Sequence, residues 1–126
     1  MHQPIYVVAF RAEQRVGLDN ALLAHAITAT SFEAPDAFLA DATAGTGCVV
    51  VAADLPDAGA MRVIDELGRR RSRIAVVVVG CDHDLASAVA FVRAGAAEFV
   101  EPPVRAGRLV NAVHRALAGA RKNPSP

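Results

Sequence analysis

The chain alternates between two kinds of apolar pattern, and this alternation restricts it to a small set of folds. Short runs in which nearly every residue is apolar occur at Ile5–Phe10, Cys48–Ala53 and Ile74–Val79. Between them, apolar residues recur every three or four positions, as on one face of an amphipathic helix. The runs CVVVAA and IAVVVV have no polar face, which is typical of strands in a parallel sheet that is covered by helices on both sides.

Weaker segments complete the series. Two further strands are predicted at Ile27–Phe32 and Ala96–Val100, and helices are expected between and after all the strands. Pro35 is a suitable first-turn residue for the second helix, and Gly68 and Gly95 are expected to end the third and fourth. The apolar faces of the five helices, in chain order, comprise Val16, Leu18, Leu22, Leu23 and Ala26; Phe38 and Leu39; Met61, Ile64 and Leu67; Leu85, Ala88, Val89 and Val92; and Leu109, Val113 and Leu117.

Strands that alternate with helices predict right-handed crossovers between parallel strands. The expected fold class is therefore α/β, a doubly wound (βα)5 three-layer sandwich with a five-stranded parallel sheet. The 126 residues suit one domain. We assign residues 1–119 to it and interpret residues 120–126 (ARKNPSP) as a polar tail or the start of a linker.

The residue balance excludes several classes of function. Thirteen basic residues are offset by thirteen acidic ones, so there is no overall field to hold nucleic acid or a membrane. No apolar run approaches the length of a membrane span, and the first residues do not resemble a secretory signal. Cys48 and Cys81 fit no zinc spacing and suggest unreactive thiols in a reducing, cytoplasmic setting.

In such sheets, ligands bind beyond the carboxyl ends of the strands. The residues expected there are Phe10 with Arg11, Ala53 with Asp54, 80–84, and 101–103. The only Gly-x-Gly, at residues 45–47, precedes a strand and lacks a following Lys, which disfavours a nucleotide site.

His83 lies between Asp82 and Asp84, a group that could ligate a metal ion. No second cluster of ligands is visible in the sequence, and either aspartate is a suitable helix cap. We therefore interpret this segment as a capping loop and predict no metal and no cofactor.

At these loops the chain resembles the response-regulator receiver (CheY-like) family, over about residues 4–119. The segments that carry the resemblance are 88–103 (AVAFVRAGAAEFVEPP), 52–59 (AADLPDAG) and 36–39 (DAFL). Positions 52, 80 and 102 also have the spacing of the family's functional residues, without a gap. The resemblance implies a flavodoxin-like sheet with strand order 2-1-3-4-5.

The family transfers a phosphoryl group to an aspartate after its third strand. That aspartate and two acids after the first strand hold Mg²⁺, while a hydroxyl after the fourth strand and a lysine after the fifth contact the phosphoryl oxygens. The matching residues here are Ala9 and Phe10 for the acids, Ala52 for the acceptor, Gly80 for the hydroxyl and Pro102 for the lysine. Mg²⁺ requires carboxylates, and this transfer depends on the metal and on positioned donors. The chain is thus expected to be a degenerate pseudo-receiver and not an enzyme.

The resemblance assigns roles to three further positions. Phe99 matches the family's switch aromatic, and without a hydroxyl at Gly80 we expect it to be static. The bond before Pro103 is predicted to be cis, as at the family's lysine-proline pair. Asp54 and Asp57 are the only acids near the lost acceptor and are the candidates for a surrogate.

The predicted function is a phosphorylation-independent module that binds another protein or itself, in signal transduction or transcriptional regulation. The region 84–117 is the expected interface, by analogy with the fold. Its charged residues are Arg93, Glu98, Glu101, Arg105 and Arg108. Two alternatives stay open, namely an atypical phosphoacceptor at Asp54 or Asp57 and a small-ligand sensor at the strand ends.

A basic cluster, Arg69, Arg70, Arg71 and Arg73, has two interpretations. It could contact nucleic acid or acidic partners, or it could be a solvated group of cations that suits a helix C-terminus. With no net basic charge and no recognition helix, direct nucleic-acid binding by this chain alone is not expected.

Overall fold

The structure is a computed structural model that describes residues 3–42, 45–80 and 85–122. Within these ranges, five strands alternate with five α-helices and one short 3₁₀ helix, η1. In chain order the elements are β1 (Ile5–Val8), α1 (Ala12–Leu23), β2 (Thr30–Phe32), α2 (Pro35–Asp41), β3 (Thr46–Ala52), η1 (Pro56–Ala58), α3 (Gly59–Arg69), β4 (Arg73–Val79), α4 (Leu85–Ala94), β5 (Glu98–Val100) and α5 (Ala106–Lys122).

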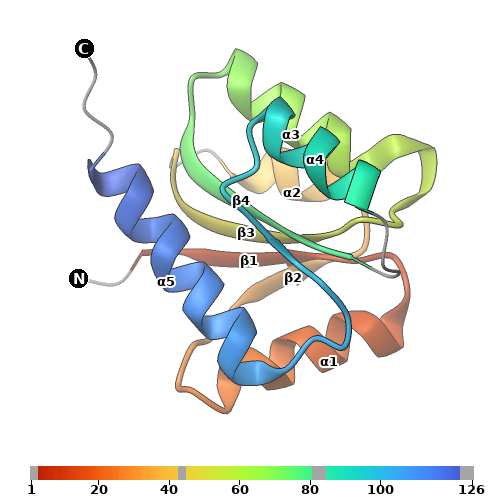
Figure 1. Ribbon diagram of the computed structural model, residues 1–126, viewed down its shortest axis with the longest axis vertical. Helices are drawn as coiled ribbons and strands as arrows, with labels where there is room; N and C mark the ends of the chain where they lie inside the picture. The colour runs from red at the N-terminus through yellow and green to blue at the C-terminus, as the bar shows by residue number, and fades with distance from the viewer. Residues whose placement is uncertain (1–2, 43–44, 81–84, 123–126) are drawn as a thin grey trace.

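The strands form one sheet in the order β2-β1-β3-β4-β5, and every pair is parallel. Helices α1 and α5 cover one face of the sheet, and α2, α3 and α4 cover the other (Figure 1). The predicted fold class and strand order are confirmed. Helix α5 continues to Lys122, past the point where a polar tail was expected to begin.

The two central strands form the core because both of their faces are covered. β3 and β4 pair along their whole length, from Thr46 opposite Arg73 to Ala52 opposite Val79. After its first residue each strand is buried throughout. This burial explains why neither sequence run has a polar face.

An aromatic cluster fixes α2 against the outer part of the sheet. Phe38 is fully buried, and its ring meets that of Tyr6 edge-on, with the centroids 5.1 Å apart. The Phe32 ring lies 6.0 Å from Phe38 and 6.4 Å from Tyr6, centroid to centroid, so the three rings form a triangle. Burial of Tyr6, together with the charge of Asp41, raises the pKa of the Tyr6 hydroxyl.

Of the two helix ends predicted at glycines, one is confirmed and the other is wrong. Gly95, with φ 126°, follows α4 as predicted. Gly68, however, lies inside α3, and the left-handed residue that ends this helix is Arg71, with φ 53°. Its N–H bonds to the Gly68 carbonyl and that of Ser72 to the Leu67 carbonyl, which is the Schellman pattern.

The predicted buried faces of α1 and α4 were partly wrong. In α4, Phe91 is buried and packs on Phe99, which turns Val89 and Val92 outward at 44% and 51% exposed. In α1, Leu18 and Leu22 face the sheet because they lie four residues apart on one stripe. Val16 and Leu23 lie on another stripe and are exposed.

Candidate functional site

The carboxyl ends of the central strands meet at one edge of the sheet, and apolar groups occupy that edge. Ala9 and Ala52 are fully buried, and Gly80 is buried beside them at the end of β4. Backbone bonds continue the sheet at this edge. The Ala9 N–H donates to the Phe32 carbonyl, the Ala53 N–H to the Val79 carbonyl at 2.8 Å, and the Gly80 N–H to the Val100 carbonyl at 2.9 Å. The structure thus brings together the three positions that sequence reasoning placed at the strand ends.

Two arginines at the start of α1 provide the charge at this edge. The Arg11 guanidinium donates to the Asp54 carboxylate at 2.8 Å and so joins the loops after β1 and β3. Arg15 donates to the carbonyl oxygens of Ala9 and Phe10, at 2.8 and 3.1 Å. Sequence reasoning placed Arg11 in this loop but missed both contacts; the only available signal was a pair of arginines four residues apart directly after a strand.

The Arg11–Asp54 pair is partly exposed, with 59% and 30% of the two side chains accessible. An exposed ion pair of this kind contributes at most about 1 kcal/mol to stability. Its effect here is local, because it engages the Asp54 carboxylate at this edge. Asp57, the other candidate acid, is exposed in η1 with a left-handed φ of 58°.

Phe99 and the loop after β5 complete the edge. Phe99 is half-buried and its ring stacks on Phe91, with centroids 6.2 Å apart and an interplanar angle of 16°. The peptide bond between Pro102 and Pro103 is cis, which confirms the prediction. Pro102 is half-buried and offers no charge where the resemblance would place a lysine.

The residues available for metal or thiol chemistry are few. In the described ranges, no group of three or more His, Cys, Asp or Glu side chains could hold a metal ion. Burial raises the pKa of the Cys48 thiol to about 12, so this group is protonated and unreactive. Cys81 and the loop Asp82, His83 and Asp84 lie outside the described residues.

The charged residues of the predicted interface lie on α4, β5 and α5 and in the loop between β5 and α5. Arg93, Arg105 and Arg108 are exposed, and Glu101 is exposed after β5. Glu98 accepts a hydrogen bond from Arg115 at 3.0 Å, a contact that sequence reasoning missed. That contact raises the pKa of the Arg115 guanidinium, which stays charged. In the part of the chain that the structure covers, no helix is both long and apolar enough to cross a membrane.

Comparisons with known proteins agree with this geometry. No model of a protein family matches the chain. The transcriptional regulatory protein FixJ of Azorhizobium caulinodans is 28% identical over 115 residues, which are 90% of this chain and 54% of that protein. The chain therefore spans about half the length of this curated relative.

Solved structures of response regulators are also similar to this chain. Full-length FixJ from B. japonicum superposes with a TM-score of 0.84 at 26% identity, over 98% of this chain and 61% of that one. A response regulator receiver protein from Pseudoalteromonas atlantica gives 0.78 at 26% identity, over 92% of this chain and 98% of that one. By strand order and by likeness in sequence and structure, the chain has the receiver fold and is similar to response-regulator receiver (CheY-like) domains.

Proposed function

We propose that this receiver domain works without phosphorylation, as a protein-interaction or dimerisation module in signal transduction or transcriptional regulation. One observation carries the proposal: Ala9 and Ala52, at the positions where the family resemblance expects an acid and the phosphoacceptor, are fully buried methyl groups. A methyl group is neither a nucleophile nor a metal ligand. Phosphoryl transfer depends on a bound metal and positioned donors, and these positions supply neither.

The charges at the carboxyl edge support the same proposal. The Arg11 guanidinium lies 2.8 Å from Asp54, and the Arg15 guanidinium caps the carbonyl oxygens of Ala9 and Phe10. A divalent cation that approached this edge would be repelled by both guanidinium groups. It would also compete with Arg11 for the Asp54 carboxylate. The positive charge at this edge therefore comes from two guanidinium groups of the chain, whereas an active receiver binds Mg²⁺ from solution there.

The regulatory setting is inferred from the relatives. FixJ is a transcriptional regulatory protein, and this chain matches about half of it. We infer that the partner is another protein or a second copy of this domain, bound through the region 84–117. This surface contains Arg93, Glu98, Glu101, Arg105 and Arg108. The equal numbers of acidic and basic residues argue against direct DNA binding by the domain alone.

A second candidate function is an atypical phosphoacceptor at Asp54. This carboxylate is 30% exposed at the correct edge of the sheet, and Arg11 is a cation that could help to neutralise an incoming phosphodonor. Against it, the contact with Arg11 engages one of the two carboxylate oxygens, Oδ2, and makes the carboxylate a weaker nucleophile. The small-ligand sensor remains a prediction, and the complete burial of Ala9 and Ala52 leaves their methyl groups no accessible surface for a ligand.

Intact-mass measurement after incubation with a small-molecule phosphodonor and Mg²⁺ separates the two candidates. We expect no phosphoryl adduct on the wild-type chain, while a receiver domain that retains its acceptor aspartate, treated in parallel, gains one. Asp54→Asn and Asp57→Asn serve as matched variants. An adduct on the wild type that disappears in Asp54→Asn would establish the second candidate and overturn the first.

A further inference from the structure

The turn between α3 and β4 gathers cations at the amino edge of the sheet, opposite the candidate functional site. Arg70, Arg71, Ser72 and Arg73 follow one another there and line an open recess of about 580 Å³. Ala42, Gly45 and Thr46 form its other wall. Among the described residues, no acidic side chain and no aromatic ring lines this recess. We refer to it as the amino-edge recess.

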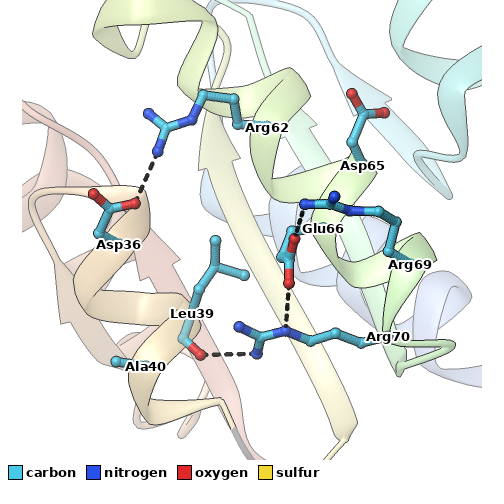
Figure 2. A pocket seen from close by; sticks show the side chains of 8 residues that line it. All are labelled: Asp36, Leu39, Ala40, Arg62, Asp65, Glu66, Arg69 and Arg70. Atoms are coloured by element: carbon cyan, nitrogen blue, oxygen red, sulfur yellow. Dashed lines mark hydrogen bonds and ion pairs between the residues drawn. The ribbon is translucent and has the colours of Figure 1, made fainter.

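The neighbouring groove between α2 and α3 differs because its charges are paired. Arg62 donates to Asp36 at 2.8 Å, and Glu66 accepts hydrogen bonds from Arg69 and Arg70 (Figure 2). The two arginines lower the pKa of the Glu66 carboxyl, which therefore stays ionised. This groove has little net charge left to attract a ligand.

Arg70 lines both cavities and is held between them. Its Nε donates to Glu66 at 2.9 Å, and its Nη1 donates to the Leu39 carbonyl at 2.8 Å (Figure 2). Arg71 and Arg73 are exposed, and within the described ranges neither side chain makes an ion pair or hydrogen bond. The uncompensated positive charge of this region is therefore confined to the amino-edge recess.

The backbone of the turn from Arg70 to Arg73 is held by hydrogen bonds. The Arg71 and Ser72 N–H groups close the C-terminus of α3, and the Arg73 N–H donates to the Gly45 carbonyl at 2.8 Å. The Ser72 hydroxyl oxygen accepts a bond from the Ile74 N–H at 3.1 Å. Arg71 occupies a left-handed position at which glycine is usual. Because the backbone donors of the turn are occupied, recognition falls to the guanidinium groups, and the rigid turn lowers the ordering cost of binding.

The form of the recess decides which anion it fits. Duplex DNA needs an extended basic stripe that contacts many phosphates, and this turn offers two uncompensated arginines. Single-stranded nucleic acid needs aromatic side chains on which bases stack, and none lines the recess in the described residues. Guanidinium groups pair with carboxylates through two parallel hydrogen bonds. We propose that the amino-edge recess binds an acidic polypeptide segment, whose Asp or Glu carboxylates pair with Arg71 and Arg73.

Fluorescence anisotropy with the full chain and a labelled peptide of alternating Glu and Ser tests this proposal. We expect saturable binding that weakens as salt is added, and no binding of the matching Gln–Ser peptide. Arg71→Gln and Arg73→Gln should each weaken binding about tenfold, the loss expected for a charge-assisted hydrogen bond. Arg62→Gln, which removes the same charge from the paired groove, should leave the affinity unchanged.

Thermal unfolding of each variant shows that it is folded, and the exposed positions of both arginines predict unchanged midpoints. The proposal is overturned if the Glu–Ser peptide does not bind, or if Arg62→Gln weakens binding as much as Arg71→Gln does. It is also overturned if duplex DNA or inorganic phosphate binds more tightly than the peptide. Salt-sensitive self-association that Arg73→Gln abolishes would assign the recess to a second copy and overturn the acidic peptide as its ligand.

Discussion

Replacing Ala52 by Asp puts the chemistry of the carboxyl edge to a direct test. The Ala52 side chain is fully buried, and its neighbour across the edge, Ala9, is equally buried and apolar. A carboxylate placed there has no free partner among the described residues, since Arg11 is engaged by Asp54 and Arg15 by the Ala9 and Phe10 carbonyl oxygens. A buried charge that lacks its partner destabilises a protein by roughly 3–5 kcal/mol. We expect Ala52→Asp to lower the free energy of unfolding by about 3 kcal/mol at neutral pH, a large share of the total for one domain.

The loss should depend on pH in a defined direction. Burial raises the pKa of the new carboxyl above its unfolded value of about 3.9. The folded state therefore binds the proton more tightly than the unfolded state. The destabilisation is small below about pH 3.9, grows as pH rises to the folded pKa, and is constant above it. Urea unfolding followed by circular dichroism between acid and neutral pH measures it, with Ala52→Asn as the uncharged control at each pH.

The argument fails if Ala52→Asp and Ala52→Asn unfold at the same urea concentration at neutral pH. It fails more completely if Mg²⁺ raises the stability of Ala52→Asp alone. That outcome would mean that the edge can accept a carboxylate and a metal ion after one substitution. The apolar residues at the edge would then not account for the proposed independence from phosphorylation.

Three further predictions follow from the same structure. Millimolar Mg²⁺ should leave the melting temperature of the wild-type chain unchanged, because no cluster of ligands among the described residues could hold the ion; a rise of several degrees in differential scanning calorimetry would contradict this. Phe38→Ala should cost about 3–5 kcal/mol in urea unfolding, since the ring is fully buried, and a loss below about 1 kcal/mol would mean that the aromatic cluster repacks. Gly47→Ala adds only one methyl group but should be strongly destabilising. The new Cβ would lie 2.1 Å from the Pro4 carbonyl oxygen, at a backbone φ of 117°. Wild-type-like unfolding of Gly47→Ala would show that the start of β3 can move.

The parts of the fold that sequence reasoning predicted correctly are those with a one-sided or fully apolar pattern. β3 and β4 are apolar on both faces, so no other assignment fits them. The face of α4 could not be chosen in the same way, since Val89, Phe91 and Val92 are all apolar and point in different directions. Packing of Phe91 on Phe99 decided which of them is buried.

At the candidate site, too, local features were predicted correctly and contacts between distant residues were not. Its location and its apolar residues followed from strand ends and family spacing, which are local features of the sequence. The contact of Arg11 with Asp54 joins residues 43 positions apart and depends on β1 and β3 being neighbours in the sheet. The end of α3 at Arg69, followed by the left-handed Arg71, was missed because Gly68 is the residue with the stronger local preference for ending a helix.

The all-parallel sheet also bears on how the chain reaches its native state. Each pair of adjacent strands has at least one helix between its members along the sequence, so no hairpin can form early and guide the rest. The longest ladder, β3 with β4, can start only after the whole of α3 has been brought back across the sheet. Closing such loops before any contact compensates for the lost entropy slows folding relative to a domain with hairpins, and a helix with its two flanking strands is the smallest unit able to nucleate the sheet.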